Sequence, residues 1–286
     1  FKLNTMKTVN SISGGKTSAY IAAKYPADYN VFALVRTSDI SCIYPDKKLR
    51  QIVSDKLGGV EFIGTLEDDI IIKTMLDLEQ FIGKEISWVT GETFDYVVDN
   101  KGGVLPSSYR RFCTTELKLI PIIKWWQKEV KEICEMRIGF RLGEEKRMQT
   151  MLDKLVDGYE SNKMIVGKSK NGKRNKWKDV VWRKPTFPLI KDRINKLNVE
   201  NYWIKNPQVK HQPINNCVGC FHQNEILLRK RFDWHPNKLE WFLKQEKKGK
   251  GTFKEHITYE NIKKHNLQIE LSFDDFNECD SGFCGL

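Results

Sequence analysis

The sequence predicts an α/β fold: a twisted parallel sheet with helices on both faces, followed by a smaller C-terminal region that carries cysteines. In the first half of the chain, short apolar runs alternate with stretches of helical periodicity, the pattern of a parallel sheet covered by helices. The first apolar run leads directly into a glycine-rich turn, where ligand-binding loops lie in such sheets. We therefore expect one domain over residues 6–190 and a helical, cysteine-containing region over residues 191–286.

Each element follows from its local pattern. Strands are expected where short apolar runs occur: 8–13, 31–35, 60–63 and 135–140. Helices are expected where apolar residues recur with helical spacing: 17–24, 45–57, 68–81, 114–131, 192–203, 225–232 and 236–247. Pro236 fits the first position of the last helix, because its missing N–H has no helical partner there.

Residues 163–184 break the alternation and predict a β-hairpin with a basic tip. The turn signal Asn171-Gly172 separates two short apolar runs. The segment contains nine Lys or Arg residues and one acid, Asp179. Such a surface suits a phosphodiester backbone, and Trp177 and Trp182 are candidates to stack on unpaired bases. A solvated hairpin explains the same residues, so nucleic acid is a candidate partner and not a required one.

Charge, hydropathy and cysteine content limit the class of function. The 286 residues have a formal charge of +11 and a pI near 9.2, which favours an anionic partner: a nucleotide, a nucleic acid or only counterions. No apolar run is long enough to span a bilayer and no signal-peptide pattern is present, so we expect a cytoplasmic protein without a membrane partner. Seven cysteines in a cytosolic chain are more typical of metal binding or catalysis than of disulfides.

The turn at residues 13–18, Ser-Gly-Gly-Lys-Thr-Ser, has the residue types that hold a phosphate group. Glycines let backbone N–H groups approach an anion, and the N-terminus of the following helix adds partial positive charge. Lys16, Thr17 and Ser18 supply side-chain donors. The turn is not a Walker A loop, because that motif requires a glycine at the position of Asn10.

The turn resembles instead the SGG-x-[DT]-S loop of the PP-loop ATP pyrophosphatase superfamily, whose members cleave ATP between the α- and β-phosphates. Thr17 stands where many members carry Asp. Later stretches resemble, in the expected order, elements of the 3′-phosphoadenosine-5′-phosphosulfate reductase family: 34–38, 110–121, 138–147 and 187–189. The resemblance covers roughly residues 7–190, and it implies an adenine nucleotide alpha hydrolase-like fold with a nucleotide-binding domain over residues 6–190.

The resemblance also implies the residues of the nucleotide site, together with ATP and Mg²⁺. The nucleotide-binding candidates are Ser13, Gly14, Gly15, Lys16, Thr17, Ser18, Thr37 and Arg141. The catalytic candidates are Lys16, Arg111, Lys118 and Arg141. Guanidinium and ammonium groups bind phosphate and sulfate oxygens, and Lys16 can neutralise the charge that builds up on a departing pyrophosphate.

The cysteines form a second constellation. Cys217 and Cys220 are separated by two residues, which lets both bind one metal, but a site needs further ligands. By residue type, three or four thiolates suit an iron-sulfur cluster or zinc, and a structural pair of reduced cysteines is the remaining alternative. The resemblance favours a 4Fe-4S cluster held by Cys113, Cys217 and Cys220. Because the family's second adjacent cysteine is absent, we expect a fourth ligand from the tail: Cys284, or else Cys279.

The expected function is ATP cleavage for sulfur transfer. The resemblance to tRNA thiolation and DNA phosphorothioation enzymes implies adenylation of an acceptor, followed by iron-sulfur-dependent sulfur transfer. Nucleic acid is then a candidate acceptor, and a sulfur-donor protein such as a cysteine desulfurase is a candidate partner.

Two alternatives stay open. A sulfonucleotide reductase is the first, because residues 278–279 and 284–286 resemble the Glu-Cys-Gly-Leu of that branch, although reductases tend to lose the intact SGG loop. A non-catalytic nucleotide-binding partner in a DNA-modification or defence complex is the second, because Thr17 replaces Asp.

Overall fold

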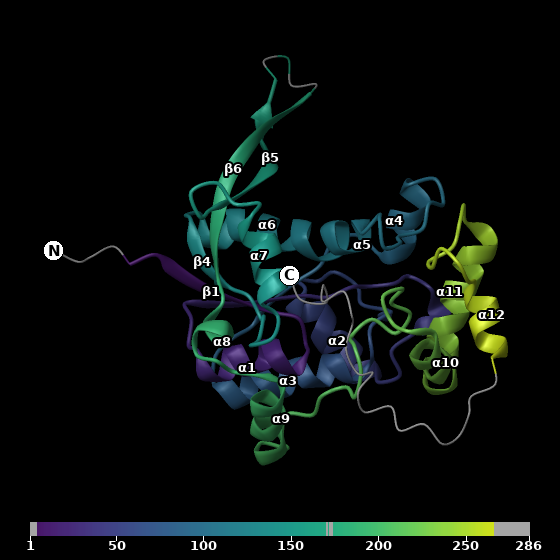
Figure 1. The fold of residues 1–286 in the computed structure, drawn as a ribbon. Coiled ribbons are helices and arrows are strands. Elements are labelled where there is room, and N and C mark those ends of the chain that lie inside the picture. Colours follow the sequence, from purple (N-terminus) through teal and green to yellow (C-terminus); the bar gives the residue numbers. More distant parts are fainter. Residues whose placement is uncertain (1–4, 170, 172–173, 266–286) are drawn as a thin grey trace.

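The computed structural model describes residues 5–169, 171 and 174–265, which form an α/β molecule built on one six-stranded sheet (Figure 1). The strands are β1 (Lys7–Ile12), β2 (Tyr29–Ala33), β3 (Ser87–Val89), β4 (Cys134–Arg137), β5 (Glu160–Lys168) and β6 (Asn175–Thr186). Their order is β3-β2-β1-β4-β6-β5, and every neighbouring pair is parallel except β5 and β6. The expected α/β class with a mainly parallel sheet is confirmed.

Helices connect the strands, and further helices follow β6 in the described part of the C-terminal region. Those before β5 are α1 (Lys16–Lys24), α2 (Lys47–Lys56), α3 (Ile70–Ile82), α4 (Phe94–Asn100), α5 (Phe112–Thr114), α6 (Ile120–Trp125) and α7 (Glu145–Leu152), with the 3₁₀-helix η1 (Ile40–Cys42) and the π-helical segments η2 (Thr115–Leu119) and η3 (Trp126–Val130). Those after β6 are α8 (Pro188–Lys191), α9 (Lys196–Lys205), α10 (Glu225–Trp234), α11 (Pro236–Lys248) and α12 (Tyr259–Lys264).

The expected strand at residues 60–63 is wrong. Phe62 in this segment is buried in the core, but the segment pairs with no strand of the sheet. The neighbouring Gly64 forms only isolated bridges, to Thr37 and Ile43. Gly64 crosses the η1 loop so closely that a Cβ atom there would lie 1.9 Å from the Cys42 carbonyl oxygen. The strand that actually extends the sheet beyond β2 is the short β3.

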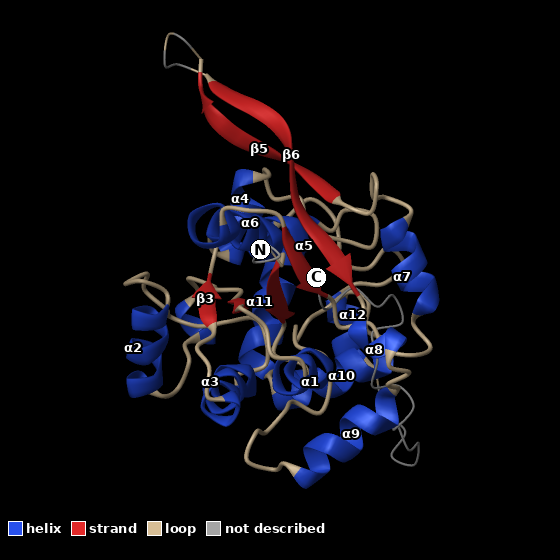
Figure 2. Ribbon diagram, turned by 90° about the vertical axis from the view of Figure 1, so that its left-hand side faces the viewer, coloured by secondary structure: helices blue, strands red, loops and turns tan. Residues whose placement is uncertain are grey.

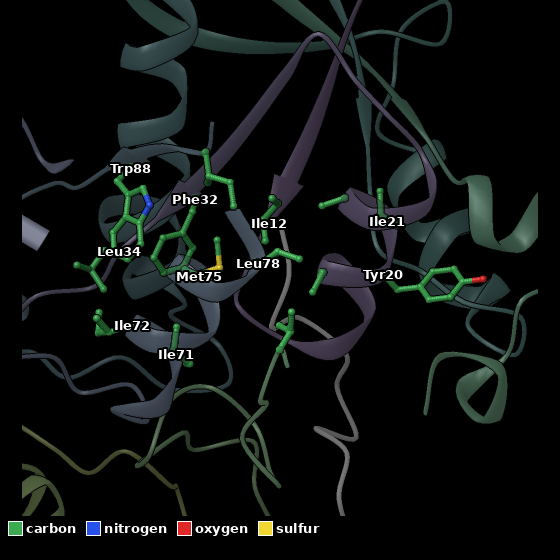
Figure 3. Packing of buried hydrophobic residues seen from close by; sticks show 14 of the residues in the cluster. Ile12, Tyr20, Ile21, Phe32, Leu34, Ile71, Ile72, Met75, Leu78 and Trp88 are labelled. Atoms are coloured by element: carbon green, nitrogen blue, oxygen red, sulfur yellow. The ribbon is translucent and has the colours of Figure 1, made fainter. Parts of the chain in front are cut away.

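Apolar side chains of the central strands alternate between the two faces of the sheet, and both faces are covered. One face carries a cluster with α1, α3 and α9, part of which Figure 3 shows around Ile12, Phe32 and Ile71. The other face packs Val9 and Val31 against α6 and η3. This cluster includes the Trp125 and Trp126 rings, so they are core residues. Coverage of both faces is what a parallel sheet requires.

A third cluster joins the C-terminal helices to the body of the fold. Side chains of α10, α11 and α12 pack with Val35, Leu66 and Leu117. Residues on both sides of position 190 therefore share one core, and the division at that position stays a prediction. Within the described residues no helix has the length and apolar character to cross a membrane. Cys279 and Cys284 lie outside the described residues.

Candidate functional site

The turn between β1 and α1 is a compact loop closed by Ser18. The Ser18 hydroxyl accepts a hydrogen bond from the Ser13 N–H at 3.0 Å and donates to the Gly15 carbonyl oxygen at 3.0 Å. It also lies 3.0 Å from the Ser13 hydroxyl, and Ser18 is only 6% exposed. Ser18 therefore shapes the loop from within, while Lys16 and Thr17 are half-buried at the start of the helix.

Two glycines let neighbouring chain segments approach this loop. Gly14 has a left-handed φ of +85°, and a Cβ atom there would lie 2.7 Å from Cγ2 of Ile71 in α3. On the other side, the loop that follows β4 brings Gly139 against the methyl group of Thr17, since a Cβ there would lie 3.6 Å from it. The carboxyl ends of β1 and β4 thus meet where the sequence predicts a phosphate site.

A segment far along the chain, residues 211–217, packs over the loop. The Asn216 side-chain amide donates to the Ser13 carbonyl oxygen and accepts from the Gln212 amide. Both side chains are 5% exposed, and the Gln212 Oε1 atom is buried with no hydrogen-bond partner among the described residues. These contacts add residues that lack any motif, so the sequence did not identify Asn216 or Gln212 as part of the site.

His211 belongs to the same segment and lies near Lys16. Its ring packs 4.6 Å from the Trp203 ring, and Trp203 donates a hydrogen bond of 2.9 Å to the Lys16 carbonyl oxygen. Burial lowers the pKa of His211 to about 4, and the Lys16 charge contributes to the same shift. His211 is therefore a neutral imidazole beside the loop at physiological pH.

One pocket is lined by three cysteines from two distant parts of the chain: Cys113, Cys217 and Cys220. Cys113 lies in α5, whereas Cys217 ends the segment that packs over the loop and Cys220 comes just after it. The pocket has a volume of about 80 Å³, and His222 and Lys118 also line it. Burial raises the pKa of the Cys113 thiol, so without a metal this thiol stays protonated at neutral pH. The structure thus brings together the three described cysteines that the sequence grouped.

The turn that carries Cys217 and Cys220 is held by buried partners. Gln223 donates to the Cys217 carbonyl oxygen at 2.7 Å, and the Tyr259 hydroxyl donates to the Gly219 carbonyl oxygen at 2.9 Å. A Cβ atom on Gly219 would lie 2.5 Å from the Phe242 ring, so only glycine fits. Burial raises the pKa of Tyr259 well above its usual value, and the charges of Cys220, Cys217 and Cys113 add to this shift.

Lys118 lies at the cysteine pocket and forms an ion pair with Glu67 at 2.8 Å. The Glu67 side chain is 1% exposed, and its backbone bridges Cys217 in antiparallel fashion. The sequence did not single out Glu67, which follows the buried Thr65 and Leu66 just before α3. Glu67 lies near Cys217 because two segments far apart in the sequence pair there, and no local sequence pattern predicts such a contact.

The other predicted cations have different surroundings. Arg141 follows Gly139 and bonds the Glu144 carboxylate through its Nε at 3.2 Å and its backbone N–H at 2.8 Å. Arg111 donates to the Ser108 carbonyl oxygen at 3.2 Å. Arg147 also pairs with Glu144 and lies over the Phe140 ring.

Thr37 is 1% exposed, and its hydroxyl donates to Asp95 at 2.6 Å. The structure thus uses the Thr37 hydroxyl to hold α4, and the nucleotide contact predicted for Thr37 stays a prediction. Cys42 and Cys134 are buried and do not line the pocket.

The thiol set suits a thiolate-ligated centre in its donor chemistry. Within residues 5–169, 171 and 174–265, no three His, Cys, Asp or Glu side chains are arranged so that they could hold one metal ion. The predicted fourth ligand, Cys284, lies outside those residues. Comparisons of the chain with protein-family models, with curated proteins and with solved structures found no match.

Proposed function

We propose that this chain is a PP-loop ATP pyrophosphatase with an adenine nucleotide alpha hydrolase-like fold, which binds the phosphates of ATP and Mg²⁺ on residues 13–18. The observation that carries the proposal is the loop itself, closed by Ser18 between a central parallel strand and the N-terminus of α1. A loop in this position directs backbone N–H groups and the positive end of the helix dipole at an anion.

The proposed roles follow from the side chains at the loop. The acceptor oxygen attacks the α-phosphorus, the bond between the α- and β-phosphates breaks, and pyrophosphate leaves. Lys16 neutralises the charge that develops on pyrophosphate, and Arg141 binds a phosphate oxygen after exchanging its Glu144 partner. Because residues 13–18 include no carboxylate, Mg²⁺ would be held chiefly by phosphate oxygens, with hydroxyl groups completing its shell.

We further propose that Cys113, Cys217, Cys220 and Cys284 hold a 4Fe-4S cluster, with zinc as the alternative metal. Three of these thiols share a pocket that Lys118 also lines, which supports the grouping. Such a cluster, when bound, would supply an iron atom for sulfur delivery to the activated acceptor. The chain's own contribution is to position the thiols on rigid turns next to the segment that covers the loop.

Product analysis tests the proposal. Anaerobically purified protein should convert ATP to AMP and pyrophosphate, and Lys16→Ala should lower turnover by about 10²-fold or more if Lys16 stabilises the transition state. Lys48→Ala, an exposed lysine on α2, is the matched control and should leave turnover unchanged. Release of ADP in place of AMP contradicts the pyrophosphatase assignment.

The same protein distinguishes the alternatives. A sulfonucleotide reductase would release sulfite from adenylyl sulfate or phosphoadenylyl sulfate and would leave ATP intact. A non-catalytic partner would bind ATP in calorimetry without turnover. If the wild-type protein binds ATP but turns it over no faster than Lys16→Ala does, the non-catalytic class is favoured.

A further inference from the structure

The β5–β6 hairpin projects from the body as a two-stranded ribbon, at the end of the molecule opposite α9 (Figures 1 and 2). β6 pairs with β4 only through residues 183–186, so residues 175–182 pair with β5 alone. The base of the ribbon is anchored by Trp182 and Met164, which are buried in the cluster beneath it. The outer part has no such cover among the described residues, and both of its faces reach solvent.

The structure corrects two details of the sequence-based interpretation. Trp182 is 0% exposed and packs against Trp126, so it is unable to stack on a base. Arg183 is 1% exposed and pairs with Glu160 at 2.8 Å, so it is not one of the surface cations. Trp177, in contrast, is 62% exposed.

Two exposed apolar side chains of the ribbon, which together we call the platform, lie among its remaining cations. Trp177 and Ile165 face each other across the two strands, and Ile165 is 46% exposed. Strand alternation and the pairing register place Lys163 and Lys168 on the same face as this pair, whereas Lys176 and Lys178 lie on the opposite face of the ribbon. Arg174, near the tip, and Lys184, at the base, are also exposed. The exposed acid of the ribbon, Asp179, lies opposite Lys163.

Edge protection explains only part of this surface. Lysines on an edge strand prevent pairing with other chains, and β5 is an edge strand. That role gives no reason to expose a Trp and an Ile side by side, because exposed apolar residues make an edge more adhesive. A ring and an aliphatic side chain with lysines along the same face instead match the surface of proteins that hold unpaired nucleotides, where bases stack on aromatic rings and cations follow the phosphates.

We propose that the β5–β6 hairpin binds single-stranded nucleic acid, with Trp177 and Ile165 as the stacking platform and Lys163 and Lys168, on the same face, as phosphate contacts. A duplex offers its phosphates to the lysines but keeps its base faces stacked internally, so only unpaired nucleotides use the whole surface. This inference does not depend on the proposed ATP chemistry.

The position of the platform also sets a length. Trp177 precedes Thr186 by nine residues on β6, which corresponds to about 30 Å at the rise of a β-strand. The backbone of Thr186 bonds Ile138, next to Gly139 at the phosphate loop. A polymer that occupies the platform and also reaches the loop must therefore span about 30 Å, roughly nine steps of a stacked nucleic acid.

Binding of fluorescent oligonucleotides to the full chain tests the proposal. We expect single-stranded DNA or RNA to bind at low salt, with log Kd rising linearly with log salt, and a matched duplex to bind more weakly. Trp177→Ala should weaken single-strand binding by about 5- to 150-fold, the range of one base-stacking interaction, without changing the salt dependence. Lys163→Gln with Lys168→Gln should reduce the slope of that dependence by about 0.7 for each phosphate that the variant no longer neutralises.

Matched controls separate this platform from general effects. Trp234→Ala removes another exposed Trp, from α10, and should leave binding unchanged, since Trp234 is 51% exposed but outside the ribbon. Circular dichroism should show that both variants are folded. The proposal is overturned if Trp177→Ala and Trp234→Ala behave alike, if duplex binds as tightly as single strand, or if the chain binds only anionic phospholipid vesicles. If the full chain binds the oligonucleotide but does not turn over ATP, only the ATP proposal is contradicted.

Discussion

Replacing Gly14 by alanine tests whether the phosphate loop depends on a close approach between β1 and α3. The glycine has a φ of +85°, and an added Cβ would lie 2.7 Å from Cγ2 of Ile71, which is itself 0% exposed. Left-handed backbone costs a non-glycine residue about 1–2 kcal/mol, and overpacking a core costs about 1–3 kcal/mol. The reduced freedom of the unfolded chain returns about 0.4–1 kcal/mol. We therefore expect Gly14→Ala to lower the free energy of unfolding by about 1–5 kcal/mol.

Gly139→Ala is the matched control, because it lies on the opposite side of the same loop. Its Cβ would meet the nearest atom, Cγ2 of Thr17, at 3.6 Å, an ordinary contact distance. Urea unfolding followed by circular dichroism should show a change of less than about 1 kcal/mol for this variant.

A double variant separates the steric cost from the backbone cost. Ile71→Leu removes the clashing Cγ2 atom while conserving volume, at an expected cost below about 1.5 kcal/mol. Combined with Gly14→Ala it should recover part of the stability, giving a coupling energy of about 0.5–3 kcal/mol. Equal stabilities for Gly14→Ala and Gly139→Ala would refute the reasoning.

Three further predictions concern the residues around the loop and the pocket. Lys118→Met should destabilise the chain by about 3–5 kcal/mol, because it leaves the buried Glu67 carboxylate without its ion-pair partner. Adding Glu67→Gln should restore most of the stability. A coupling energy below about 0.5 kcal/mol between the two substitutions contradicts the ion pair. Stability should fall by about 2 kcal/mol between pH 7.5 and pH 5 through His211, because its folded pKa of about 4 lies below the unfolded value, so the unfolded state takes up the proton first. His211→Gln should remove that part of the pH dependence, while His256→Gln, at an exposed site, should keep it. Cys113→Ser or Cys217→Ser should lower the iron and sulfide content of anaerobically purified protein, and Cys42→Ser should not; equal contents in all three variants contradict the proposed ligand set.

The parallel sheet was predictable from the sequence because its strands are apolar runs separated by helical patterns. The same signal failed at residues 60–63, where a short apolar run packs Phe62 into the core without pairing. Short apolar runs do not distinguish these two outcomes. Conversely, β3 contains only Ser87–Val89, which is too short to produce a periodic signal.

Some residues of the candidate site were predictable from the sequence and others were not, for the same reason. Residues 13–18 were predictable because a strand, two glycines and a helix start are adjacent in sequence. Glu67, Gln212 and Asn216 were not, because each is a single residue whose role depends on where a distant segment crosses. Cys113 was grouped with Cys217 and Cys220 only through the family resemblance, since spacing alone does not show that positions so far apart share a pocket.

The segment at residues 211–220 links the two halves of the candidate site. Asn216 bonds the loop through the Ser13 carbonyl oxygen, and its own carbonyl oxygen accepts from the Asp68 N–H at 2.7 Å. The next residue, Cys217, bridges Glu67 at the cysteine pocket. A ligand that shifts the loop therefore acts on the same short segment that positions the thiols.

This connection predicts reciprocal coupling. If ATP changes the metal affinity of the Cys217 and Cys220 thiols by altering this segment, the metal must change the ATP affinity by the same factor. Asn216→Ala should reduce that coupling by about 0.5–2 kcal/mol, measured as the ratio of ATP dissociation constants with and without the metal. Asn215→Ala is the matched control, because its side-chain nitrogen makes no hydrogen bond among the described residues. If both variants keep the full ratio, the segment only connects the loop and the pocket and does not couple them.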